Sequence, residues 1–184
     1  MATYDSIINV EEWISDHFLT TDETKGESYG KRVAARVKEW KDDEADSGHT
    51  SPLTRFTSLR RELQNALATL DESTVDETTT LIRRALGYGE PTRRTFTRAG
   101  TTTEFDAWAG VAGSALLLVA EPIPTLEDFP TTTVRGEVLV DAKPSSPTAS
   151  ALVGDIFLAD NPPEFIVVIA GGWVVLAERE SWPL

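Results

Sequence analysis

Two carboxylates in the second half of the chain have the order and spacing of a metal-dependent hydrolytic site. Asp106 lies in a β-like run, and Glu121 closes the apolar run 115–120 fifteen residues later. Two acids at neighbouring strand ends can hold one Mg²⁺, and a nearby cation can assist the attack of water. Ile123, two residues after Glu121, supplies no such cation. The pattern predicts Asp106 and Glu121 as catalytic and metal-binding residues with little or no activity. Ordinary surface acids at strand ends are the alternative.

This arrangement resembles that of the PD-(D/E)xK nucleases, in which an acid on one strand is followed by Glu-x-Lys at the end of the next. A second segment, Asp141-Ala142-Lys143, has the same acid-x-Lys sequence pattern after the β-like run 134–140. Because an Asp-x-Lys tripeptide arises often by chance, we give this second match little weight.

A short segment near the C-terminus is similar to the Asn/Asp-Pro-Pro-aromatic loop of the DNA N6-adenine methyltransferases. Here the segment is Asn161-Pro162-Pro163. Its fourth position is Glu164, so the aromatic ring that stacks on a flipped base is missing. The interpretation we favour is that the segment stops a helix before a strand.

Basic side chains recur on the helices expected in the first half. The candidates for contacts with DNA phosphates are Arg32, Arg36, Arg55, Arg60 and Arg61. Their helical spacing allows them to line one surface, and each phosphate contact would add salt dependence to binding. A solvated face balanced by neighbouring glutamates is the alternative.

Composition excludes several other chemistries. The 184 residues include no cysteine, so disulfides and thiolate metal sites are excluded, and there are only two histidines. No Gly-x-Ser-x-Gly nucleophile motif occurs. We therefore expect no bound cofactor apart from Mg²⁺ at an intact pair of acids.

The net charge of −13 is unevenly spread along the chain. Residues 1–100 hold 14 Lys/Arg against 18 Asp/Glu, a net of −4, whereas residues 101–184 hold 3 against 12, a net of −9. An acidic second half disfavours DNA binding without help from other regions. No signal peptide or membrane-spanning apolar run is present in the sequence, so we expect a cytoplasmic protein without membrane contact.

The elements that would position these side chains change character near residue 90. About four helices are expected over residues 1–90, from apolar residues spaced three and four apart. The first stripe comprises Ile7, Val10, Ile14 and Phe18. The last helix is expected to begin with a capping box, Thr74-x-x-Glu77, and to stop at Gly87.

Residues 91–184 read as a mixed sheet with one further helix. The expected strands are residues 94–98, 104–109, 115–120, 134–140, 165–170 and 173–178, and the expected helix is 148–159. The continuous apolar run 115–120 predicts a strand buried on both faces. The fold class is therefore α+β, with a helical segment (1–90) and a mixed sheet (91–184) that form one compact unit.

Two longer patterns resemble a known family, the N-terminal regions of large bacterial type IIG-like restriction–modification proteins. The first is Asn9-x-x-x-Trp13-Ile-Ser-x-His17-Phe, followed by Arg32-Val-x-x-Arg36-x-Lys38-x-Trp40. The second is Pro162-Pro163-x-Phe165-Ile-Val-Val-x-x-Gly171-Gly172-x-Val-Val-Leu176-x-x-Arg179-x-x-Trp182. In that family a nuclease-like region precedes an N6-adenine methyltransferase.

The resemblance implies a degenerate nuclease-like domain that contacts DNA only as part of the parent protein. Its partners would be DNA and the downstream methyltransferase region, which alone would bind S-adenosylmethionine. A non-catalytic, acidic protein-interaction domain is the alternative function.

Overall fold

The computed structural model describes Phe18 and residues 28–110 and 115–182. These residues form an α+β structure with four α-helices and a mixed sheet of seven strands, which confirms the expected α+β class with a mixed sheet. The likeness of the sheet to a PD-(D/E)xK core stays a prediction. The chain divides into two compact units, Met1–Thr57 and Ser58–Leu184. The helix expected around Ile7 and Ile14 lies outside the described residues. Within the described part, no helix combines the length and apolar character needed to cross a membrane.

The two ends of the first described helix, α2 (Tyr29–Ser47), are defined by capping residues. The Ser28 hydroxyl accepts a hydrogen bond from the Lys31 N–H at 3.3 Å, which satisfies one free donor of the first turn. Gly48 ends the helix in the left-handed conformation and donates its N–H to the Glu44 carbonyl. The next helix, α3 (Pro52–Ala68), spans the division between the two units.

Helix α4 (Val75–Leu86) ends as expected but begins differently. Gly87, with φ 85°, caps its C-terminus. The predicted capping box is wrong, because the Thr74 side chain makes no capping hydrogen bond. Instead the Asp71 carboxylate accepts the N–H groups of Ser73 and Thr74, at 2.8 and 3.0 Å, and forms a polar turn ahead of the helix.

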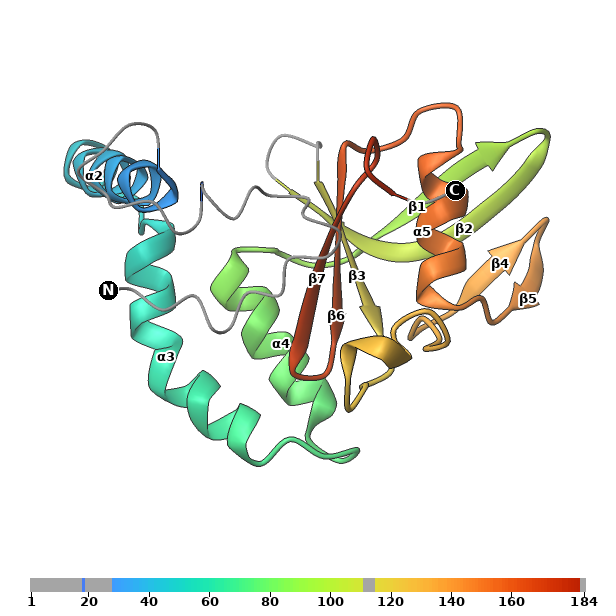
Figure 1. The fold of residues 1–184 in the computed structure, drawn as a ribbon, viewed down its shortest axis with the longest axis horizontal. Coiled ribbons are helices and arrows are strands. Elements are labelled where there is room, and N and C mark those ends of the chain that lie inside the picture. Colours follow the sequence, from blue (N-terminus) through green and yellow to red (C-terminus); the bar gives the residue numbers. More distant parts are fainter. Residues whose placement is uncertain (1–17, 19–27, 111–114, 183–184) are drawn as a thin grey trace. The chain divides into compact units, whose positions relative to one another are not determined.

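The sheet belongs to the second unit, and its strands follow the order β5-β4-β2-β3-β6-β7, with β1 paired to β2 (Figure 1). The strands are β1 (Thr92–Arg98), β2 (Thr101–Ala109), β3 (Ala115–Ala120), β4 (Val138–Val140), β5 (Lys143–Ser145), β6 (Phe165–Ala170) and β7 (Trp173–Glu178). β3 and β6 are parallel, and the other pairs are antiparallel. The connection from β3 to β6 includes helix α5 (Ala149–Phe157).

Strand β3 is buried on both faces, as its continuous apolar sequence predicted. Leu116 and Leu118 join a core cluster with residues of α5, including Leu152 and Ile156. Leu117 belongs to a second cluster that contains residues of α3 and α4. α5 therefore covers one face of the β3–β6 pair, and the end of α3 with α4 covers the other (Figure 1).

Two tight turns connect the outer strand pairs of the sheet, β6 with β7 and β4 with β5. Gly171, with φ 66°, turns β6 into β7, which confirms the expected hairpin. The strand expected over 134–140 is shorter, and Asp141 and Ala142 form a turn with positive φ that leads into β5. The Asp141 carboxylate accepts the Thr102 N–H at 2.9 Å, so this side chain ties the β4–β5 turn to β2.

Candidate functional site

The first predicted metal-binding acid, Asp106, is exposed on β2. It alternates with the buried residues Phe105 and Ala107, so its carboxylate points away from the α5 core. Arg93 lies directly opposite on β1 and approaches the Asp106 carboxylate to 3.7 Å. The same guanidinium lies 3.9 Å from Glu104 and 3.4 Å from Glu137. We call these four residues the Arg93 cluster.

The second predicted acid, Glu121, lies immediately after β3. Its backbone N–H donates to the Thr133 carbonyl, and its carbonyl accepts the Thr132 hydroxyl, which fixes the main chain there. The Glu121 carboxylate accepts a hydrogen bond from Arg135 at 3.3 Å. Arg135 also pairs with Asp76 of α4 at 3.0 Å. We call Arg135, Glu121 and Asp76 the Arg135 cluster.

Each predicted acid is thus engaged by its own arginine. An arginine fork next to a carboxylate supplies the positive charge that a metal ion would otherwise supply. Among the described residues, no group of three or more His, Asp or Glu side chains is placed to hold a metal ion. The predicted sharing of one Mg²⁺ by Asp106 and Glu121 stays a prediction.

The position expected for a catalytic lysine is part of the core. Ile123 is only 7% exposed and packs in the cluster formed with β3 and α5. Glu121, two residues earlier, is exposed and faces Arg135. The chain leaves the strand at Ala120, so residues 121 and 123 do not continue the alternation of β3 into one polar face.

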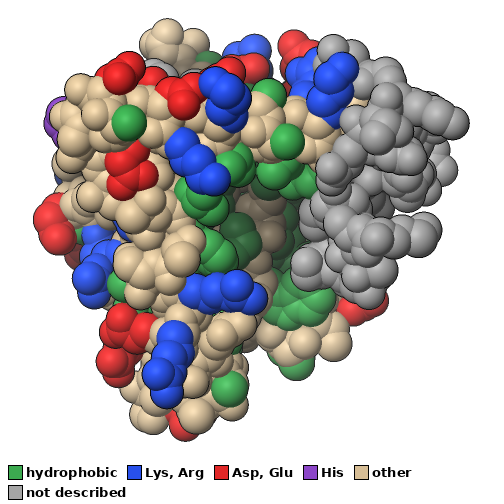
Figure 2. All heavy atoms as spheres, turned by 90° about the vertical axis from the view of Figure 1, so that its left-hand side faces the viewer, with side chains coloured by type: hydrophobic (Ala, Val, Ile, Leu, Met, Phe, Trp, Pro, Cys, Tyr) green, Lys and Arg blue, Asp and Glu red, His purple; other side chains and the backbone are tan. Residues whose placement is uncertain are grey.

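The five arginines predicted to contact phosphate belong to both compact units. Arg32 lies over the Phe18 ring at 5.9 Å, and Arg36 forms an exposed ion pair with Glu39 at 2.9 Å. Arg55 is half-buried on α3, whereas Arg60 and Arg61 are exposed. On the face drawn in Figure 2, Lys and Arg side chains are interspersed with acidic and apolar ones. Convergence of the five arginines stays a prediction.

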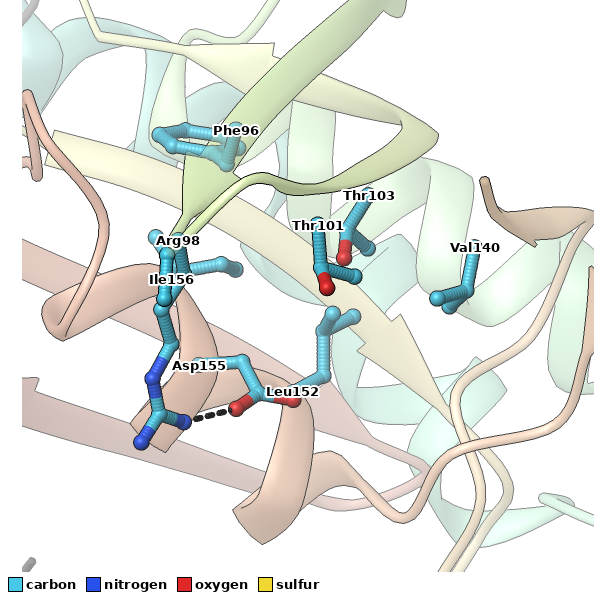
Figure 3. Close-up of a pocket in the computed structure, with 9 residues that line it drawn as sticks. Phe96, Arg98, Thr101, Thr103, Val140, Leu152, Asp155 and Ile156 are labelled. Carbon is cyan, nitrogen blue, oxygen red and sulfur yellow. Dashed lines mark hydrogen bonds and ion pairs between the residues drawn. The ribbon is translucent and has the colours of Figure 1, made fainter. Parts of the chain in front are cut away.

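A hollow of about 280 Å³ lies between α5 and the β1–β2 hairpin (Figure 3). Phe96, Thr101 and Thr103 line it from the strands, and Leu152 and Ile156 line it from the helix. At its edge the Arg98 guanidinium pairs with the Asp155 carboxylate and links β1 to α5. Since its charged groups neutralise each other, this hollow has the chemistry of a packing gap or a weak binding site, not of a catalytic centre.

A second hollow, of about 360 Å³, lies beside the Asn161-Pro162-Pro163 segment. This segment follows α5 and precedes β6, as expected of a helix stop before a strand. The Asp160 N–H donates to the Thr97 carbonyl at 3.0 Å, which fixes the segment against β1. Arg94 and Phe96 of β1 line the same hollow.

Burial perturbs one further ionisable group near the sheet. Tyr88 packs partly buried against the cluster of α3, α4 and β3, and this burial raises the pKa of its phenol. A raised pKa keeps the hydroxyl protonated at neutral pH, so Tyr88 offers no phenolate for catalysis.

Sequence reasoning missed the three arginines that define the charged surroundings of the sheet, Arg93, Arg94 and Arg135. A signal for Arg94 was present, because Arg94, Phe96 and Arg98 alternate along one strand, which places an arginine in phase with an apolar residue. The partners of Arg93 and Arg135 lie up to 59 residues away in the sequence, so no local sequence pattern predicts these ion pairs.

Comparison with protein-family models, curated proteins and solved structures finds no significant match in any of the three.

Proposed function

We propose that this chain is a non-catalytic, nuclease-like region of a bacterial type IIG-like restriction–modification protein. In this proposal it acts on DNA in the cytoplasm only together with a downstream methyltransferase region. The mixed sheet, with helices on both faces and with acids on β2 and directly after β3, is compatible with a degenerate PD-(D/E)xK core. The sequence patterns around Trp40 and Gly171 support the family assignment.

The observation that carries the non-catalytic part of the proposal is the environment of the two acids. Arg93 pairs with Asp106, Arg135 pairs with Glu121, and the lysine position is filled by the core residue Ile123. A nuclease of this type needs its carboxylates free for the metal ion and a cation beside the attacking water. Loss of such charge stabilisation raises the activation barrier by a few kcal/mol in comparable sites.

The direct test is incubation of the chain with supercoiled plasmid in Mg²⁺ or Mn²⁺. We expect no nicking above the buffer control, and no saturable Mn²⁺ binding by titration calorimetry. The matched variant is Asp106→Ala, which should behave like the parent chain. Sustained nicking that Asp106→Ala abolishes would show that the site is a working nuclease.

One observation favours the alternative, a protein-interaction domain. Val174 and Leu176 of β7, the last strand in the sheet order, are 51% and 48% exposed. Exposed apolar side chains on an end strand are typical of surfaces that pair with another chain. Duplex binding that weakens steeply with salt would support the DNA proposal, whereas salt-independent binding to a protein would support the alternative.

A further inference from the structure

Arg93 and Arg94 are neighbours on β1 with opposite electrostatic surroundings. Successive side chains of a strand point to opposite faces, so the two arginines lie on different sides of the sheet. Arg93 is engaged by three carboxylates. Among the residues that the structure describes, none forms an ion pair or hydrogen bond with the Arg94 side chain, and its Nε is buried without a described partner.

An arginine in this state is energetically costly. Burial separates the Nε–H from bulk water, and no acceptor among the described residues bonds it. Unsatisfied buried donors are rare in folded proteins, and each needs an explanation such as a bound ion or ligand. The cost is also unexpected here, because the chain carries 30 acidic residues against 17 basic ones, and a surface carboxylate would be easy to supply.

The residues that line the hollow beside Arg94 suit an anion that carries an apolar group. Its described walls combine the apolar residues Phe96, Leu116, Pro162 and Pro163 with the polar residues Arg93, Thr95 and Asn161, and none of the described lining residues is acidic. Phe96 is itself held in place by stacking on Phe105, with ring centroids 5.7 Å apart. A volume of about 360 Å³ lies at the lower end of the range for small-molecule sites.

We propose that this hollow binds a small organic oxyanion, a carboxylate or phosphate ester attached to an apolar body. The guanidinium of Arg94 donates to the anionic oxygens, as its planar fork suits both groups. The apolar body lies against Phe96 and the two prolines, and the Asn161 amide supplies a further hydrogen bond. Arg93 also lines this hollow, but its guanidinium is engaged by the carboxylates of the Arg93 cluster, so Arg94 is the arginine assigned to the ligand. The proposal does not depend on any action on DNA.

The test is an NMR titration of the ¹⁵N-labelled chain that follows the Arg94 Nε–Hε signal. The probes are phenyl phosphate and benzoate, with inorganic phosphate as an anion without a ring and benzamide as a ring without a charge. We expect saturable shifts with phenyl phosphate or benzoate at a Kd of about 1 mM, the range for one charged contact plus a small apolar body. Inorganic phosphate should bind about tenfold more weakly or not at all, and benzamide should leave the signal unmoved.

Two variants separate this site from general anion binding. Arg94→Lys keeps the charge but loses the fork, so phenyl phosphate should bind about tenfold more weakly. Because the Arg94 signal is lost in that variant, its titration follows the backbone amides of Thr95 and Phe96. Arg84→Lys, an exposed position on α4, should leave binding unchanged.

Three results would overturn the proposal. The first is that neither phenyl phosphate nor benzoate binds saturably. The second is that inorganic phosphate binds as tightly as the organic anions. The third is that Arg94→Lys keeps full affinity. The difference between benzoate and phenyl phosphate identifies which oxyanion the site prefers. Binding by either one supports the proposal.

Discussion

Helix α2 and the β3–β6 strand pair are held by different kinds of interaction. Among the described residues of α2, Gly30 is the buried one, and exposed ion pairs join Arg36 to Glu39 and Lys38 to Asp42. In the strand pair, β3 contributes five buried residues in succession, and α5 and α4 cover its two faces. The described contacts of α2 thus include exposed local ion pairs, whereas the strand pair is stabilised by long-range apolar burial.

The difference shows where this chain tolerates change. Exposed ion pairs contribute at most about 1 kcal/mol each, because water competes for both partners. Burial of one leucine contributes about 1.5–3 kcal/mol. Substitutions in the strand pair should therefore reduce the free energy of unfolding far more than substitutions in α2 or its connection to α3.

The largest effect should come from Ile123→Lys. In a nuclease-like site whose only defect is the missing lysine, this change would restore function. We instead expect the free energy of unfolding to fall by about 4 kcal/mol, because it places an unpaired ammonium in an apolar core. Urea unfolding measures the loss, and Ile123→Val, at about 1 kcal/mol, is the control. A stable Ile123→Lys protein that gains Mg²⁺-dependent nicking would contradict the proposed non-catalytic role.

Leu118→Ala sharpens the contrast within the second unit. Leu118 is 1% exposed in the α5-side cluster, so its truncation should cost about 3 kcal/mol. Leu67→Ala on α3, where the side chain is 42% exposed, should cost less than about 1 kcal/mol. Equal losses in urea unfolding of the two variants would mean that the assigned core is wrong.

Gly171→Ala tests the β6–β7 turn. Gly171 has φ 66°, and a Cβ there would lie 2.9 Å from the Pro122 Cβ, so both strain and a clash oppose the substitution. We expect a loss of about 2 kcal/mol in thermal unfolding. The neighbouring Gly172→Ala is the matched control, since its added Cβ would lie at an ordinary contact distance of 3.8 Å from the described Leu70 side chain. The prediction fails if the two variants lose the same stability.

The smallest effect concerns Glu44 in the first unit. Hydrogen bonds from Thr54 and then from Ser51 lower the pKa of the Glu44 carboxyl below its ordinary value. A lowered folded-state pKa stabilises the fold above the unfolded pKa, and this contribution is lost as the pH falls through the folded pKa. Thr54→Val should move the Glu44 pKa upward in an NMR titration of the carboxyl ¹³C signal. Thr57→Val, whose hydroxyl bonds the Leu53 carbonyl, should leave it unchanged.

Local sequence was sufficient for several elements. The apolar run 115–120 indicated a doubly buried strand, Gly171-Gly172 indicated a hairpin, and Gly87 indicated a helix end, because each depends on neighbouring residues alone. β5 was missed because Lys143-Pro144-Ser145 has little strand propensity and forms only through pairing with β4. The capping box at Thr74 was mispredicted because the Asp71 carboxylate accepts the Thr74 N–H, and the Thr74 hydroxyl bonds the main chain of Asp71 and Thr69 instead.

For the candidate site too, some features followed from local sequence and others only from the tertiary structure. The sequence by itself placed Asp106 on one strand and Glu121 at the end of the next, since strand positions follow from hydrophobic pattern. Only the tertiary structure decided that Arg93 and Arg135 engage them, that Ile123 enters the core, and that Arg94 lines a hollow without a described partner. Strand alternation depends on residues next to each other, whereas ion pairing and burial depend on strand register and helix packing, which bring together residues that lie far apart in the sequence.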